Sequence, residues 1–311
     1  MRWQGRRSSS NMQSSGRGVR RGATLSGVGL ILGLLAFLIT KNPFAAINIA
    51  LNGGALQPGP VETQELQLNA DEQELYDYSG VVLADTEDTW HDILKKYGHR
   101  YKEPQLLIFQ DNTQSGCGIA SAGMGPFYCS LDRSIYMDLA FYRMLIDEFG
   151  ADEGDFILSY VISHEVGHHV QNELGILDQV HRAQRGSSSE AANELSVRLE
   201  LQADYLAGVV ARHQGEAGYL ENGDIEEAIS AAWVIGDDAI QKQKRGYVQP
   251  ESFTHGSSEQ RTRWFQKGYD AGIFLILTPS IPKNIRMLPT SEQKYIAILL
   301  YPGDKQDETR A

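Results

Sequence analysis

Apolar residues recur at helical spacing in several long stretches of this chain. Residues 71–98 form the first stretch, with Leu75, Tyr78 and Val82 on one face of the expected helix. Further stretches with this spacing, most of them ended by a glycine, predict helices over residues 152–174, 189–213, 224–245 and 257–270. The pattern therefore predicts a domain in which long helices dominate.

Shorter apolar segments between the first two helices predict strands. Gln105–Gln110 has an apolar centre, and Ser134–Leu139 alternates between apolar and polar residues. The glycine-rich segment Ser115–Ser130 between them is expected to add a strand and a turn. A few strands followed by packed helices indicate an α+β fold with a small antiparallel sheet.

The N-terminal region has a different character. Residues 1–21 contain six arginines and no acidic residue, and we expect them to be a disordered basic arm. Residues 22–40 carry no charge and are long enough to form one transmembrane helix. Residues 41–70 are rich in glycine and proline, as a linker would be.

The arginines before residues 22–40 favour a cytoplasmic position for residues 1–21. The domain over residues 71–275 and the tail over residues 276–311 would then lie beyond the inner (plasma) membrane, in the periplasm or outside the cell. A secretory signal peptide and a buried core helix are the alternative interpretations of residues 22–40.

The net charge of the chain is −12 despite the basic arm, with 40 acidic residues against 28 lysines and arginines. An acidic surface repels the phosphate backbone of nucleic acids. We therefore expect no nucleic-acid partner.

The two cysteines, Cys117 and Cys129, enclose eleven residues, four of which are glycine or proline. Such a segment folds back easily, so the sequence predicts a disulfide in an oxidising compartment outside the cytoplasm. Two buried free thiols and a zinc-binding pair of cysteines are the alternatives.

The segment HEVGH at residues 164–168 carries the strongest chemical signal. On a helix, His164 and His168 lie one turn apart on the same face, where two imidazoles can bind one Zn²⁺ ion. Glu165 can take a proton from a water that the zinc activates. A buried histidine pair without metal is the alternative, and His169 is expected at the helix surface or beside a ligand.

A third zinc ligand must come from another segment. Gln171 and Leu174 stand where one class of zinc protease has a glycine and a third histidine. Glu200 offers a carboxylate on the next long helix, on a face of mostly small side chains that permits a close approach. Asp204, one turn further, can accept a hydrogen bond from a ligand imidazole. The alternative is a solvated charged face.

These motifs resemble those of the bacterial putative neutral zinc metallopeptidase family. HEVGHH, ELQADYLAG and FTHGSSEQRTRWFQKG carry the resemblance, together with the opening MRWQGRRSSSNMQ and the segment GPFYC, so it covers most of residues 1–275. The resemblance implies a membrane-anchored, gluzincin-like (zincin-fold) peptidase. It also implies one zinc ion bound by His164, His168 and Glu200, with Glu165 as general base.

The segment from Thr254 to Arg261 is similar to the Thr-His-Pro…Arg motif of CAAX-processing membrane peptidases, with glycine in place of proline. We expect His255 to donate a hydrogen bond to the oxyanion that forms when water attacks an amide. A helix-capping role is the alternative for His255. The glycine-rich segment Ser115–Ser130 could also supply an edge strand that pairs with an extended peptide.

Taken together, the sequence predicts zinc-dependent hydrolysis of peptide bonds, with a peptide or protein as substrate. Two other functions stay open. One is a non-catalytic, membrane-anchored binding or scaffold protein that retains the fold, although such a protein has no need of Glu165. The other is a zinc hydrolase that acts on a non-peptide amide.

Overall fold

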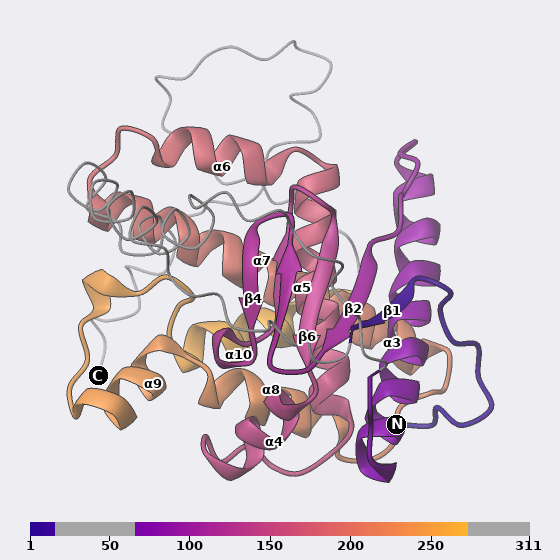
Figure 1. Ribbon diagram of the computed structural model, residues 1–311. Helices are drawn as coiled ribbons and strands as arrows, with labels where there is room; N and C mark the ends of the chain where they lie inside the picture. The colour runs from indigo at the N-terminus through magenta and orange to yellow at the C-terminus, as the bar shows by residue number, and fades with distance from the viewer. Residues whose placement is uncertain (16–65, 273–311) are drawn as a thin grey trace, which may run out of the picture.

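The computed structural model of this protein describes residues 1–15 and 66–272 (Figure 1). The transmembrane helix predicted at residues 22–40, most of the predicted linker and the tail at residues 276–311 lie outside these residues. Within the part of the chain that is described, no helix is long and apolar enough to cross a membrane.

The described residues have an α+β fold whose helices surround α5 (Phe156–Glu173), which is buried along almost its whole length. Helices α3, α6, α7 and α8 contact α5, and α10 packs along α7. The other helices of the described residues are α3 (Ala70–Lys96), α4 (Ala140–Asp147), α6 (Ile176–Gln184), α7 (Ser189–Glu216), α8 (Asp224–Val234), α9 (Asp237–Arg245) and α10 (Ser258–Ala271).

A four-stranded sheet packs against these helices and is mixed, so the prediction of an antiparallel sheet is wrong. Its strand order is β1-β2-β6-β5. The first three of these strands run parallel, and β5 runs antiparallel to β6. Between β2 and β6 the chain forms a separate hairpin and then β5. It enters β6 in the same direction as β2. The strands are β1 (Met12–Ser15), β2 (Gln105–Phe109), β5 (Phe127–Cys129) and β6 (Ser134–Asp138), and the hairpin is β3 (Asn112–Ser115) with β4 (Gly118–Ser121).

Helices α3, α5, α7 and α10 confirm the predicted helices to within a few residues, whereas the predicted helix over residues 224–245 is two helices. The break lies at Gly236, between α8 and α9. A Cβ atom at Gly236 would lie 2.3 Å from the backbone nitrogen of Ser258, so only glycine permits this approach of α10. The short helices α4 and α6 were not predicted.

Residues 1–15 are ordered, and the expectation of disorder is wrong for them. β1 pairs with β2, and the Trp3 ring packs edge-on against Tyr78 of α3. Ser8 lies against Gly80 of α3, where a Cβ atom would be 2.2 Å from the Ser8 hydroxyl. Composition alone did not reveal this order, because the contacts involve residues far along the chain.

The arginines of this arm neutralise acidic residues of α3. Arg6 pairs with the buried Asp85, and its guanidinium carbon lies 3.3 Å from the centre of the Tyr219 ring. Arg7 lies 3.0 Å from the buried carboxylate of Glu87. The arm and the domain therefore form one packed unit.

Candidate metal centre

The close approach of α5 and α7 brings the candidate ligands together. At Gly167, a Cβ atom would lie 3.1 Å from the Cα of Ala203, so the two helices meet almost backbone to backbone. The small residues of α7 permit this approach, as the sequence suggested. His164 and His168 of α5 therefore face Glu200 of α7 at short range.

The distances between these side chains fit one zinc ion. The Nε2 atom of His164 lies 3.1 Å from Oε2 of Glu200, and Nε2 of His168 lies 3.5 Å from the same oxygen. Atoms bound at about 2.0–2.1 Å to a tetrahedral zinc lie ~3.3 Å apart. Two imidazole nitrogens and one carboxylate oxygen are also the ligand set of many catalytic zinc sites, which leave a fourth position open.

The electrostatics of the candidate metal centre favour positive charge. Burial opposes the charge of Glu200, but His168 and His164 outweigh it and hold the pKa of Glu200 well below its usual value. Burial likewise lowers the pKa of His164, but Asp204 and Glu200 together raise it to about 10. The carboxylates thus favour the protonated forms of the two imidazoles, since Glu200 also raises the pKa of His168 against the effect of its burial. A zinc ion would take the place of that positive charge.

Asp204 lies beside His164, as predicted, and is fully buried. His164 Nδ1–H donates to its Oδ1 at 2.8 Å, and the Tyr160 hydroxyl donates to the same oxygen at 2.7 Å. Arg261 donates from Nε and Nη2 to both oxygens of Asp204, at 3.0 Å each. Burial opposes the charge of Asp204, but Arg261 and His164 lower its pKa to about 2.

Tyr160 and Arg261 were not predicted as members of the site. Tyr160 lies on α5 one turn before His164, and nothing in the local sequence indicates that its hydroxyl bonds to Asp204. In the sequence, Arg261 is only the last residue of the segment that begins at Thr254. Its contact with Asp204 depends on how α10 crosses α7. That crossing is close, since a Cβ atom at Gly208 of α7 would lie 2.1 Å from the carbonyl oxygen of Phe265.

The loop that carries His255 is held by Asp237, which the sequence analysis missed. Oδ2 of Asp237 accepts hydrogen bonds from the backbone N–H groups of Thr254, His255 and Gly256, at 2.7, 2.7 and 3.1 Å. Its Oδ1 lies 3.3 Å from Nδ1 of His255. The hydrogen bond to Asp237 is the main cause that raises the pKa of His255, and the charge of Glu200 adds to it.

His255 does not cap α10, so that alternative is excluded. The N-cap is Ser257, whose hydroxyl accepts from the backbone N–H of Gln260 while the Gln260 side chain bonds back to the Ser257 N–H. The His255 side chain is about half exposed. The imidazole is therefore accessible from solvent.

Glu165 follows His164 directly on α5 and is only 8% exposed. Among the residues that the structure describes, its carboxylate has no hydrogen-bond partner. This leaves its oxygens available to a water or a substrate beside His164, as a general base requires.

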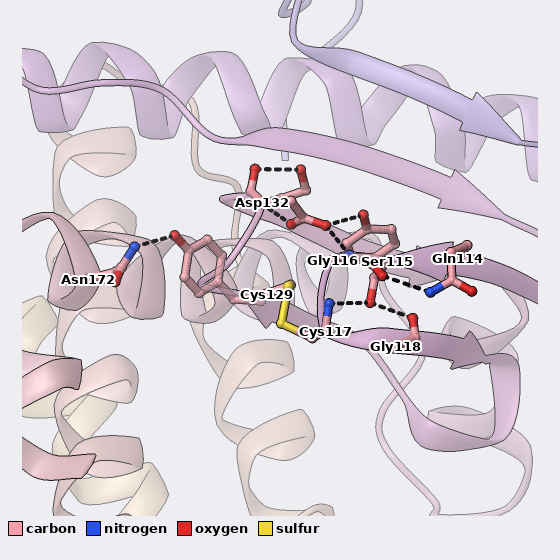
Figure 2. The surroundings of a disulfide bond; sticks show 11 residues. Gln114, Ser115, Gly116, Cys117, Gly118, Cys129, Asp132 and Asn172 are labelled. Atoms are coloured by element: carbon pink, nitrogen blue, oxygen red, sulfur yellow. Dashed lines mark hydrogen bonds between the residues drawn. A yellow bond between two sulfur atoms is a disulfide. The ribbon is translucent and has the colours of Figure 1, made fainter. Parts of the chain in front are cut away.

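Outside the sheet, β5 is fixed to two further elements, the β3–β4 hairpin and helix α5 (Figure 2). Cys117 and Cys129, the predicted pair, form a disulfide that ties the tip of the β3–β4 hairpin to β5. Beside it, the Tyr128 hydroxyl accepts a hydrogen bond from Nδ2 of Asn172 at 2.9 Å. The same hydroxyl lies 3.0 Å from Nδ1 of His169. His169 is fully buried, so it is not a surface residue; it connects α5 to the edge strand of the sheet.

Comparison with known proteins is consistent with this geometry. The model of a family described as "Putative neutral zinc metallopeptidase" matches residues 1–274. "Uncharacterized protein YpfJ" of Escherichia coli is 44% identical over 279 residues, which cover 88% of this chain and 96% of that protein. "Uncharacterized protein Mb2605" of Mycobacterium bovis is 38% identical over 241 residues, 71% of this chain and 79% of that protein. No solved structure matches this chain.

The buried pair of Arg261 and Asp204 predicts a large effect on stability. Among the described residues, Arg261 is the one arginine that bonds to Asp204. Arg261→Met removes it and leaves the charge of Asp204 buried, which costs about 3–5 kcal/mol of unfolding free energy. Denaturant unfolding of the metal-free protein measures this loss. Arg212→Met is the matched control, because Arg212 pairs with Glu216 on the surface of α7 and its loss should barely change stability. Equal effects of the two substitutions would contradict the structural role of Arg261.

Proposed function

The chain belongs to the Putative neutral zinc metallopeptidase family, and on that premise we propose that it is a gluzincin-like zinc endopeptidase. The observation that carries the proposal is the meeting of His164, His168 and Glu200 around one point, with Glu165 beside them. A non-catalytic protein has no need of a free carboxylate at that position. The name of the family and the ligand set both point to zinc.

The residues of the pocket can divide the steps of peptide hydrolysis between them. Zinc, when bound, supplies Lewis acidity that lowers the pKa of a water and polarises the scissile carbonyl. Glu165 accepts the proton that the water loses as it attacks the carbonyl carbon. It then returns this proton to the amine nitrogen as the C–N bond breaks, so that Glu165 ends the cycle ionised.

His255 is suited to stabilise the oxyanion that this attack creates. Asp237 accepts hydrogen bonds from the backbone N–H groups of Thr254, His255 and Gly256, and it raises the pKa of His255, which favours the protonated form. A protonated imidazole donates a charge-assisted hydrogen bond, which strengthens as negative charge develops on the carbonyl oxygen.

The sheet offers a place for the substrate backbone. β5 lies at an edge of the sheet and contacts α5, the helix that carries His164 and His168. An extended peptide can add to such an edge as a further strand, through main-chain hydrogen bonds that do not depend on sequence. The disulfide and the Tyr128 hydroxyl would hold this edge in place during binding.

Residues 22–40 are proposed to attach the protein to the inner membrane. Since residues 1–15 pack on the domain, both would face the periplasm or the cell exterior. Gln4→Cys and Glu74→Cys, at two exposed positions, should then both react with a membrane-impermeant maleimide in intact spheroplasts. Labelling of Glu74→Cys without Gln4→Cys would support a single crossing between them. Labelling of neither before lysis would place the domain in the cytoplasm.

The zinc assignment predicts different losses for two glutamates. Glu200→Ala should lose most of the roughly one zinc per chain that the wild type binds, because it removes a ligand. Glu165→Gln should keep the metal and lose cleavage of a peptide library. Metal analysis of the purified proteins and the cleavage assay measure both. Glu194→Ala, at an exposed position on the same helix as Glu200, serves as control and should change neither. Full activity of Glu165→Gln would exclude it as the general base.

The role of His255 predicts a selective loss of turnover. His255→Ala should reduce kcat by about 10²–10³-fold and leave KM and bound zinc nearly unchanged, because the lost hydrogen bond forms mainly in the transition state. Steady-state kinetics and a melting curve of the same variant test this. His181→Ala, at an exposed position on α6, is the control. A lower melting temperature with kcat within a few-fold of wild type would show that His255 is only structural.

A further inference from the structure

Gln171 lies on α5 beside His168 and is fully buried. Its Oε1 atom accepts a hydrogen bond from Nδ1–H of His168 at 2.8 Å. Its Nε2 atom donates to the carbonyl oxygen of Leu199 at 2.7 Å and to Oε1 of Gln202 at 2.9 Å. One amide group therefore connects a candidate ligand of α5 to the backbone of α7, at the residue that precedes Glu200.

The hydrogen bonds around Gln171 require an amide. The group must accept one hydrogen bond on the side of His168 and donate two on the side of α7. An apolar side chain would leave three polar groups without these partners. A carboxylate could still accept from His168, but its other oxygen would face the carbonyl oxygen of Leu199, an acceptor that cannot turn away.

The bond to Gln171 also fixes the tautomer of His168. With the proton on Nδ1, the lone pair of the neutral ring is on Nε2, the atom that faces Glu200 at 3.5 Å. His164 is held in the same sense by Asp204, which is charged and paired with Arg261. A neutral amide orients the second imidazole without adding another buried carboxylate to Glu165, Glu200 and Asp204, so the charge of the site does not change.

We propose that Gln171 is a positioning residue of the metal centre, which sets the tautomer and orientation of His168 and holds it in register with Glu200. This inference rests on the proposed zinc-dependent function. Gln171 would not touch the metal or the substrate and would act only through His168.

The zinc affinity of Gln171→Met tests the proposal. This variant keeps the approximate size of the side chain and removes the acceptor, so its zinc dissociation constant should rise about 10–100-fold. Competition with a chromophoric chelator, after the metal has been removed and added back, measures the constant without any substrate. Gln214→Met is the matched control, because Gln214 is equally buried but bonds to Ser159 and Asp85 instead. Its dissociation constant should stay within about threefold of wild type.

Gln171→Glu separates orientation from packing. It retains the acceptor for His168 and loses both donated bonds, so its melting temperature should fall while its zinc affinity stays much closer to wild type than that of Gln171→Met. The NMR resonance of the His168 Nδ1 proton should move downfield, because a charged acceptor strengthens the bond.

Three results would count against the proposal for Gln171. Gln171→Met could bind zinc as tightly as wild type while its melting temperature falls, which would indicate a packing role alone. Gln171→Glu could lose as much affinity as Gln171→Met. If Gln171→Met does not fold, an unmoved His168 proton resonance in Gln171→Glu would decide against it. A wild type that binds no zinc would instead overturn the proposed function.

Discussion

The close contact of α7 with two other helices is the constraint on which the site depends. α7 meets α5 where Gly167 faces Ala203, and it meets α10 where Gly208 and Gly268 bring the backbones together. At Gly268, a Cβ atom would lie 2.0 Å from the carbonyl oxygen of Tyr205. Interiors are packed too densely to absorb such an atom without moving a whole helix. Each residue of the site that contacts a neighbouring helix therefore depends on glycine at these positions, because a larger side chain would separate the helices.

This arrangement separates the charges of the site by helix. α7 carries the two carboxylates that pair with cationic side chains, Glu200 and Asp204, while α5 supplies the imidazoles and Glu165, and α10 supplies Arg261. Each carboxylate is thus neutralised from a neighbouring helix, and the attraction acts across the same contacts that the glycines permit. Replacing buried ion pairs with apolar residues often leaves stability unchanged or improves it, so such a cluster is weak evidence of a need for stability. Its place beside the candidate metal ligands favours a functional explanation instead.

The sequence predicted what depends on local spacing and missed what depends on distant contacts. His164 and His168 follow from a helix period, and Glu200 and Asp204 from their place on a face of small residues. Tyr160, Gln171 and Asp237 look like ordinary helix residues until the neighbouring elements are in place. The break between α8 and α9 was missed for the same reason, because it accommodates Ser258 more than twenty residues later. The parallel pairing of β1 with β2 joins segments whose separation leaves no trace in a local pattern.

The basic N-terminal arm shows how a charge pattern can support two interpretations. Arginines ahead of an apolar segment are typical of a cytoplasmic flank, because unpaired positive charge resists transfer across a membrane. Here Arg6 and Arg7 face Asp85, Glu87 and Asp88 of α3, so part of that charge is neutralised within the fold. The family match begins at the first residue, which is consistent with an arm that belongs to the domain. Arginines that a sequence pattern assigns to a membrane surface therefore also stabilise the fold. When the arm packs on the domain, Arg6 and Arg7 pair with acidic residues of α3, so their charge is not available to the membrane surface.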